Sequence, residues 1–306
     1  MDWNVQNIPP QHGQRVVVTG VGGLGFETAL ALAAAGAEVI LAGRNALKGA
    51  EAVRQVVRRL PQARVRCELL DLASLASVYS FADRLRAEAQ PIAILVNNAG
   101  VMTPPQRQTT ADGFELQFGT NYLGHFALTA RLLPLLCQGR ARVVNLSSIA
   151  HRRASIQFDD LQWEHRYAAW AAYGQSKLAM LMFAFELQRR STQEGLGLTS
   201  YAAHPGLART DLIVNGPQPG PVLAQLNRWV QPFVSQSAAQ GALPTLLAAT
   251  DPQAQPGAYY GPGGFNELKG LPRLARVAAA AQDLDAASRL WAVSEALTGA
   301  YWLPNH

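Results

Sequence analysis

The chain has 306 residues, 49% hydrophobic and 15% charged, with a formal net charge of +5, which is typical of a soluble globular protein with a large core. It shows neither a signal-like start nor ~18 uninterrupted apolar residues, so we expect no membrane anchor. Its two cysteines follow no spacing pattern, which argues against a disulfide framework and favours a cytoplasmic location.

Apolar strands alternate with helices from residue 15 onward. The expected strands cover residues 15–20, 37–43, 65–70, 92–96, 141–146 and 198–203, and the expected helices cover 26–35, 47–60, 75–88, 121–137 and the segment around residue 173. Continuous apolar strands separated by helices indicate a parallel sheet that is covered on both faces. The sequence therefore predicts an α/β fold with a doubly wound, Rossmann-type parallel sheet in a single domain, residues 1–306.

The alternation stops after residue 206. A stretch rich in proline and glycine follows at residues 215–221, and further helices are expected after it. Because no second run of alternating units appears, we expect residues 207–235 to form a substrate lid within the same domain.

A glycine-rich turn joins the first strand to the first helix. It reads Gly20-Val-Gly22-Gly23-Leu24-Gly25, which satisfies G-x-G-x-x-G between a strand and a helix. Glycines permit a tight turn there and let backbone N–H groups approach a pyrophosphate at the helix N-terminus. The turn predicts a dinucleotide site.

The second strand ends in Gly43-Arg44-Asn45, where no acidic residue can accept hydrogen bonds from a ribose 2′-hydroxyl. An arginine at this point can bind a 2′-phosphate, which predicts that NADP(H) is preferred over NAD(H). We expect Arg15 and the positive face after Lys48 to add a weaker long-range attraction. The alternative is that Arg44 is a solvated loop residue.

Polar residues also end the third, fourth and fifth strands. They are Asp71 with Leu72, then Asn97 with Asn98, Ala99 and Gly100, then Ser147 with Ser148. Ligands bind at the carboxyl ends of the strands in such sheets, so these groups predict one shared pocket.

One of only three lysines stands four residues after a tyrosine, in Tyr173-Gly-Gln-Ser-Lys177. Positions i and i+4 share one face of a helix, so the ammonium can lie beside the phenol. A close cation lowers the pKa of a phenol from its usual value near ~10 and makes it a usable general acid or base. Taken alone, the spacing could be a chance pairing on a solvated face.

Together these motifs resemble the short-chain dehydrogenase/reductase family, over residues 15–211. The retinol-dehydrogenase-like branch of that family is the most similar, on the segments Thr120-Asn-Tyr-Leu-Gly-His-Phe126, Val144-Asn-Leu-Ser-Ser-Ile-Ala-His151, Phe158-Asp-Asp-Leu161, His204-Pro-Gly206 and Arg289-Leu-Trp-Ala-Val-Ser-Glu295.

The resemblance implies a role for each matching residue. Tyr173 would be the acid/base, Lys177 its partner and the anchor of the nicotinamide ribose, Ser148 (or Ser147) the donor to the substrate oxygen, and Asn121 the holder of a proton-relay water. The implied cofactor-binding residues are Gly20, Gly22, Gly23, Leu24, Gly25, Arg44, Asp71, Leu72, Asn98, Ala99, Gly100, Tyr173, Lys177, Pro205, Gly206 and Thr210.

Two features depart from the family pattern. The loop from Thr19 to Gly25 is one residue shorter than usual, and the interval between Ser148 and Tyr173 is longer. That interval holds six aromatic or histidine side chains, which either line the substrate mouth or pack onto the core: His151, Phe158, Trp163, His165, Tyr167 and Trp170.

These observations predict an NADP(H)-dependent oxidoreductase that interconverts a small-molecule alcohol and its aldehyde or ketone. A non-catalytic NADP(H)-sensing regulator on the same fold is the alternative. The histidines show no metal spacing, and we expect no metal. Arginines spaced along one helix could bind nucleic acid, but no aromatic residues are interleaved with them, so we expect a solvated face and no nucleic-acid partner. A homo-oligomer stays possible.

Overall fold

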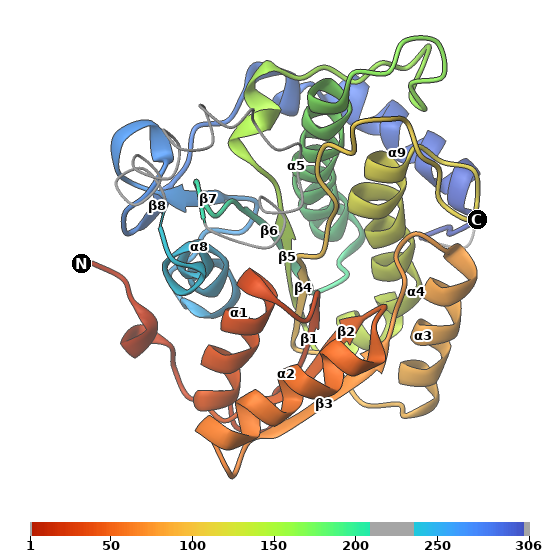
Figure 1. The fold of residues 1–306 in the computed structure, drawn as a ribbon. Coiled ribbons are helices and arrows are strands. Elements are labelled where there is room, and N and C mark those ends of the chain that lie inside the picture. The colour runs from red at the N-terminus through yellow and green to blue at the C-terminus, as the bar shows by residue number, and fades with distance from the viewer. Residues whose placement is uncertain (1, 209–235, 303–306) are drawn as a thin grey trace.

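The computed structural model describes residues 2–208 and 236–302. Eight strands form one sheet in the order β3-β2-β1-β4-β5-β6-β7-β8 (Figure 1). Every neighbouring pair is parallel except β7 with β8. The strands are β1 (Arg15–Thr19), β2 (Glu38–Gly43), β3 (Arg64–Leu69), β4 (Ile94–Asn97), β5 (Arg142–Leu146), β6 (Thr199–Ala203), β7 (Tyr259–Pro262) and β8 (Pro272–Leu274). The predicted doubly wound sheet is confirmed.

Helices cover both faces of this sheet. One face carries α1 (Gly23–Ala34), α2 (Ala46–Arg59) and α8 (Ala238–Thr250), and the other carries α3 (Leu75–Ala87), α4 (Gly124–Gln138), α5 (Ala169–Glu194) and α9 (Leu284–Thr298) (Figure 1). Each layer has its own buried apolar cluster, because the side chains of a strand alternate between the two faces. The short helical turns are η1 (Val5–Asn7), η2 (Phe118–Leu123), η3 (Ile149–Arg153), η4 (Phe265–Glu267) and η5 (Ala279–Gln282).

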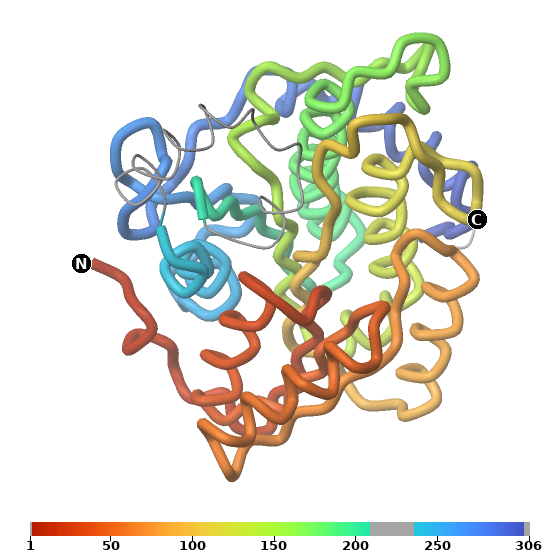
Figure 2. Tube along the Cα trace, viewed as in Figure 1, coloured from red at the N-terminus to blue at the C-terminus, as the bar shows by residue number. Residues whose placement is uncertain are grey.

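Helix α5 is deeply buried in its first half. It packs on β5 and β6 and also contacts η2, η3 and α9, so every residue from Ala172 to Ala184 is buried. The traces in Figures 1 and 2 show it running through the middle of the molecule. The close packing of residues 172–184 fixes their side chains, which is what an active site built on them requires.

Element boundaries lie close to the predicted ones, with three informative differences. Helix α1 begins at Gly23 rather than at residue 26, and the expected helix 121–137 begins instead with the π-turn η2. Strands β7 and β8, which were not predicted, extend the sheet past β6. They are four and three residues long, too short to show a periodicity.

Of the predicted lid, residues 209–235 lie outside the described residues. Its flanks are well placed: Ala208 forms a parallel bridge with Gln236, and the Gln236 N–H donates to the carbonyl of Leu207 at 2.9 Å. The two ends of the segment therefore meet beside β6.

Candidate active site

Helix α5 brings Tyr173 and Lys177 to one face, as predicted from their spacing. Both side chains are buried, with 6% and 5% of their surfaces exposed. The Lys177 Nζ lies 5.8 Å from the centre of the Tyr173 ring and donates to the carbonyl of Leu146, at the end of β5, at 3.0 Å. The lysine thus joins α5 to the carboxyl edge of the sheet.

Burial shifts the pKa values of this pair in opposite directions. Loss of water raises the pKa of Tyr173 to about 12 and lowers the pKa of Lys177 to about 8. The prediction that the lysine leaves the phenol with a lowered pKa is wrong for the protein alone, because desolvation of the phenol prevails. At neutral pH the phenol keeps its proton.

Ser148 is the serine that reaches the phenol. A hydrogen bond between its hydroxyl and Tyr173 opposes, but does not cancel, the rise in the phenol pKa. The same Oγ accepts from the Ala150 N–H at 3.2 Å, which starts η3. Ser147 instead donates to the main-chain carbonyl of Lys177 at 2.7 Å, so it faces the backbone of α5. The geometry favours Ser148 over Ser147 as the donor to a substrate oxygen.

Asn121 lies in the π-turn η2 and is fully buried. Its side-chain oxygen accepts from the Val101 N–H at 2.7 Å, and its Nδ2 donates to the Val101 carbonyl at 3.0 Å and to Ser176 Oγ at 2.9 Å. These bonds tie the asparagine to α5 and to the loop that follows Gly100. A Cβ on Gly100 would lie 2.9 Å from Asn121 Oδ1 and 3.7 Å from Lys177 Nζ, so only glycine lets this loop approach both.

The shortened glycine-rich turn still places the N-terminus of α1 at the carboxyl edge of the sheet. Gly20 has φ +92°, and Gly22 caps α1 without a side-chain hydrogen bond. A Cβ on Gly25 would lie 2.2 Å from the Gly20 carbonyl oxygen, so the turn folds back tightly on the helix. Helix α1 begins at Gly23, ahead of Leu24 and Gly25. The cradle fits a pyrophosphate bound by backbone N–H groups.

Thr19 links this turn to the loop after β4. Its Oγ1 accepts from the N–H groups of Asn98 and Ala99 at 2.8 and 2.9 Å, and Asn98 Nδ2 donates to the Thr19 carbonyl at 2.7 Å. The sequence analysis missed Thr19. A hydroxyl at the last position of β1, facing the end of the neighbouring β4, was the available signal.

The end of β2 lies beside the glycine-rich turn, since a Cβ on Gly43 would contact Val21 at 2.8 Å. Arg44 follows directly and is exposed, and Lys48 lines a cavity of about 400 Å³ together with Gly22 and Gly23. Both cations thus flank the edge where an adenosine ribose would lie.

Arg15 lies elsewhere, at the amino end of β1. It is buried and pairs with Glu38 at 2.8 Å and Glu88 at 2.7 Å. The expected contribution of Arg15 to cofactor attraction is therefore wrong, because its charge is neutralised at the opposite edge of the sheet.

The remaining predicted cofactor residues also follow strand ends. Asp71 comes after β3, and one of its carboxylate oxygens accepts from the Ala73 N–H at 3.0 Å. Leu72 packs against α4, where a Cβ on Gly124 would lie 2.5 Å from the Leu72 carbonyl oxygen.

Pro205 and Gly206 follow β6. Gly206 has φ +62° and its N–H donates to His204 Nδ1 at 3.2 Å, while His204 Nε2 contacts Glu267 at 2.9 Å. Pro205 accepts from Gln236 Nε2 at 2.7 Å. Thr210 lies outside the described residues.

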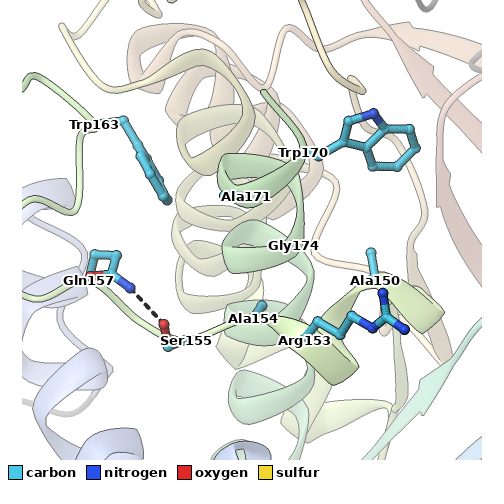
Figure 3. Close-up of a pocket in the computed structure, with 9 residues that line it drawn as sticks. All are labelled: Ala150, Arg153, Ala154, Ser155, Gln157, Trp163, Trp170, Ala171 and Gly174. Atoms are coloured by element: carbon cyan, nitrogen blue, oxygen red, sulfur yellow. Dashed lines mark hydrogen bonds between the residues drawn. The ribbon is translucent and has the colours of Figure 1, made fainter. Parts of the chain in front are cut away.

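Among the aromatic side chains between Ser148 and Tyr173, some line a cavity and one packs on the core. The Trp170 ring stands edge-on to Tyr173, 6.0 Å between centroids, and lines a cavity of about 270 Å³ with Trp163 and Arg153. Figure 3 shows Trp170 and Arg153 on one side of α5 and Trp163 on the other. Phe158 instead packs on the core beneath the Arg289 guanidinium, 4.1 Å from its ring centre.

Acids pair with two of the arginines in the arginine-rich helix and the strand that follows it. Arg54 contacts Glu51, and Arg66 contacts Glu38 and Glu88. In residues 2–208 and 236–302, no helix is long and apolar enough to cross a membrane, and no three acidic, histidine or cysteine side chains gather as metal ligands.

Comparison with known proteins agrees with this geometry. The sequence profile of the family described as short chain dehydrogenase matches residues 14–218. The chain is 42% identical to retinol dehydrogenase 12 of Mus musculus over 294 residues, which cover 95% of this chain and 88% of that protein. The chain belongs to the short-chain dehydrogenase family.

Further relatives support the retinol-dehydrogenase-like branch. Polyprenol dehydrogenase of Mus musculus is 39% identical over 308 residues, covering 98% of this chain and 88% of its own. The crystal structure of an uncharacterized protein from Mycobacterium paratuberculosis is 38% identical, with a TM-score of 0.80 over 99% of this chain and 100% of that one. This short-chain dehydrogenase is accordingly an oxidoreductase that acts on CH–OH groups with a nicotinamide cofactor, which the glycine cradle fits.

Burial of the Lys177 ammonium predicts a pH-dependent cost to folding. Below pH about 8 the lysine is charged in both the folded and the unfolded protein, so folding removes a charge from water. Between about pH 8 and 10.5 the unfolded chain holds a proton that the folded protein has lost, and stability rises with pH. Lys177→Met should therefore raise the free energy of unfolding near neutral pH, by on the order of 1–3 kcal/mol.

Denaturant titrations of wild type and variant at several pH values measure this difference. The gain of the variant should shrink as the pH approaches about 10. Lys48→Met removes an exposed lysine and should alter neither stability nor its pH dependence. A Lys177→Met protein that is less stable than wild type at neutral pH would contradict the burial cost.

Proposed function

We propose that this protein is an NADP(H)-dependent oxidoreductase that interconverts an alcohol and its aldehyde or ketone. The observation that carries the proposal is the buried phenol of Tyr173, hydrogen-bonded to Ser148 and backed by Lys177 on the same helix face. Asn121 and the glycine-rich cradle lie around this group at the carboxyl edge of the sheet. The substrate is a small molecule that reaches the phenol past Trp170.

In the reductive direction Tyr173 donates its phenolic proton to the carbonyl oxygen of the substrate. The Ser148 hydroxyl donates a hydrogen bond to the same oxygen and holds it in reach of the phenol. A nicotinamide held through the glycine-rich turn at Gly20 to Gly25 would supply the hydride that the carbonyl carbon receives, and Tyr173 would supply the proton that the oxygen receives as the C=O double bond becomes single. In the oxidative direction Tyr173 removes the proton that it otherwise donates.

The protonation states suit reduction at neutral pH. Burial keeps the proton on Tyr173, whose pKa is about 12, and Lys177 with a pKa of about 8 is still mostly charged. A buried cation near the phenol stabilises the phenolate that forms when the proton leaves, because opposite charges attract strongly out of water.

The alternative of a cofactor-sensing regulator explains less. A protein that only binds a dinucleotide needs the glycine-rich turn, but it needs no phenol bonded to a serine and no buried, nearly unpaired ammonium. A buried ammonium without a carboxylate partner lowers the free energy of unfolding, and such groups are typical of catalytic sites. Nucleic-acid binding by the arginine-rich segment is less favoured, because Arg54 of α2 and Arg66 of β3 are paired with acids.

Replacement of Tyr173 tests the chemistry. Tyr173→Phe should lower kcat by about 10²- to 10⁴-fold, because the general acid is lost, while NADPH binding changes little. NADPH consumption with a panel of aldehydes and ketones measures kcat, and cofactor fluorescence measures binding. Tyr301→Phe removes an exposed phenol and serves as the control. A Tyr173→Phe enzyme that keeps half of the wild-type kcat would exclude this role.

Cofactor preference rests on Arg44. A charge-assisted hydrogen bond is worth about 1.5–3 kcal/mol, so Arg44→Ala should weaken NADPH binding by roughly 10- to 100-fold and leave NADH binding almost unchanged. Arg58→Ala, an exposed arginine further along α2, is the matched control for net charge. Titration of both cofactors against the three proteins decides the matter. Equal losses for the two cofactors, or tighter binding of NADH by wild type, would show that Arg44 does not read a 2′-phosphate.

A further inference from the structure

His125 lies between Thr19, beside the glycine-rich turn, and Asn121, beside Lys177. None of the roles described so far includes it. It stands in the first turn of α4, four residues after Asn121, and no part of it is exposed. Both ring nitrogens are engaged: Nδ1 lies 2.8 Å from the main-chain carbonyl oxygen of Asn121, and Nε2 lies 2.9 Å from Thr19 Oγ1.

Counting hydrogen bonds fixes the direction of each contact. A carbonyl oxygen can only accept, so Nδ1 carries a proton and donates to Asn121. Thr19 Oγ1 already accepts from the N–H groups of Asn98 and Ala99, which use both of its lone pairs. The threonine hydroxyl has two acceptors in reach, Nε2 at 2.9 Å and the Val96 carbonyl oxygen at 3.3 Å. The shorter contact takes the proton, because the lone pair of Nε2 would otherwise face the lone pairs of Oγ1. The ring is therefore the neutral tautomer protonated on Nδ1.

The environment of the ring agrees with this assignment. Burial, together with the positive charge of Lys177 on α5, lowers the pKa of His125 to about 4, although the bond to the Asn121 carbonyl opposes the shift. The neutral form therefore persists over the range in which the enzyme would work.

Asn121 lies in the π-turn η2, where the helical hydrogen bonds are irregular. In η2 the Gly124 N–H bonds to the Gly119 carbonyl, five residues back, which interrupts the ordinary i to i+4 ladder at this point. The ring of His125 reaches back along the helix and contacts the Asn121 carbonyl. The Asn121 side chain bonds to Val101 and Ser176. The His125 ring contacts the main-chain carbonyl of Asn121 from the side on which Thr19 lies.

We propose that His125 is a positioning residue: its Nδ1 donates to the Asn121 carbonyl and holds the main chain of the π-turn in place, and the hydrogen bond from Thr19 to Nε2 sets the tautomer that makes Nδ1 the donor. The inference rests on the proposed function, in which Asn121 belongs to the catalytic set. Loss of the Nδ1 donor would let the π-turn relax and shift Asn121 against Lys177 and Gly100, to which it is packed. Displacements of about 1 Å can cost about 100-fold in rate.

Two amide substitutions test the contacts of Nδ1 and Nε2 separately. The amide of His125→Asn lies where Nδ1 lies and can still donate to the Asn121 carbonyl. The amide of His125→Gln reaches the position of Nε2, keeps the contact with Thr19 and loses the donor to Asn121. We expect His125→Asn to keep kcat within about 3-fold of wild type and His125→Gln to lose at least about 10-fold in kcat, with the substrate KM and the NADPH Kd little changed.

Ser294→Ala is the matched control for the loss of a buried hydrogen bond. Ser294 of α9 contacts the Tyr122 hydroxyl at 2.7 Å, and Tyr122 follows Asn121 in η2, so this variant removes a buried hydrogen bond from the same π-turn and leaves the Asn121 carbonyl contact in place. This variant should lower the unfolding midpoint and leave kcat unchanged. If Ser294→Ala lowers kcat as much as His125→Gln, or if the two His125 variants have the same kcat, the positioning role is overturned.

The tautomer can be read in the wild-type protein, which needs no variant to fold. Nitrogen NMR of protein with labelled histidine should show His125 protonated on Nδ1 and unprotonated on Nε2. The opposite tautomer, or a doubly protonated ring at neutral pH, would overturn the inference whatever the kinetics show. A wild-type protein with no turnover on any carbonyl would instead overturn the proposed function, and with it the kinetic role of His125, while the NMR result would still decide the hydrogen-bond geometry.

Discussion

The removal of Tyr173 and Lys177 from water is the constraint on which the rest of the site depends. Helix α5 is enclosed by β5, β6, η2, η3 and α9, and this enclosure, more than the spacing of the two residues, fixes their protonation. Because the phenol has a pKa of about 12 and the ammonium a pKa of about 8, both groups carry their protons at neutral pH. These protonation states favour a general acid at Tyr173. Burial of the Lys177 ammonium lowers the free energy of unfolding, and the large apolar clusters on both faces of the sheet offset that loss.

Close backbone approach assembles the groups around that pair. Gly100 brings the loop after β4 against Asn121 and Lys177, and Gly25 brings α1 against the end of β1. Between them, the Thr19 hydroxyl joins the two loops that would enclose a dinucleotide, and His125 continues the same chain of hydrogen bonds to Asn121. Buried polar groups that are fully bonded in this way specify one arrangement, because any alternative leaves a donor or acceptor unsatisfied.

Much of this arrangement could be predicted from the sequence, because local spacing determines it. An i, i+4 pair shares a helix face, so the spacing of Tyr173 and Lys177 predicts their place on α5. A residue that follows a parallel strand lies at the carboxyl edge, as Ser148 after β5 and Arg44 after β2 do, whereas the choice of Ser148 over Ser147 came from the family resemblance. Properties set by tertiary packing could not be predicted. The phenol pKa shifted upward because neighbouring elements enclose α5, the π-turn at Asn121 depends on contacts with Val101 and Ser176, and β7 and β8 are too short to show a pattern.

The pH dependence of carbonyl reduction by the wild-type enzyme tests the central claim, that burial keeps Tyr173 protonated beside a charged Lys177. With saturating NADPH, and with cofactor binding measured at each pH, kcat should be level near neutral pH. It should then fall as the pH rises through about 8, where Lys177 loses its charge. A kcat that instead increases with pH over the same range would mean that the ionised phenol is the active form, and would contradict the account.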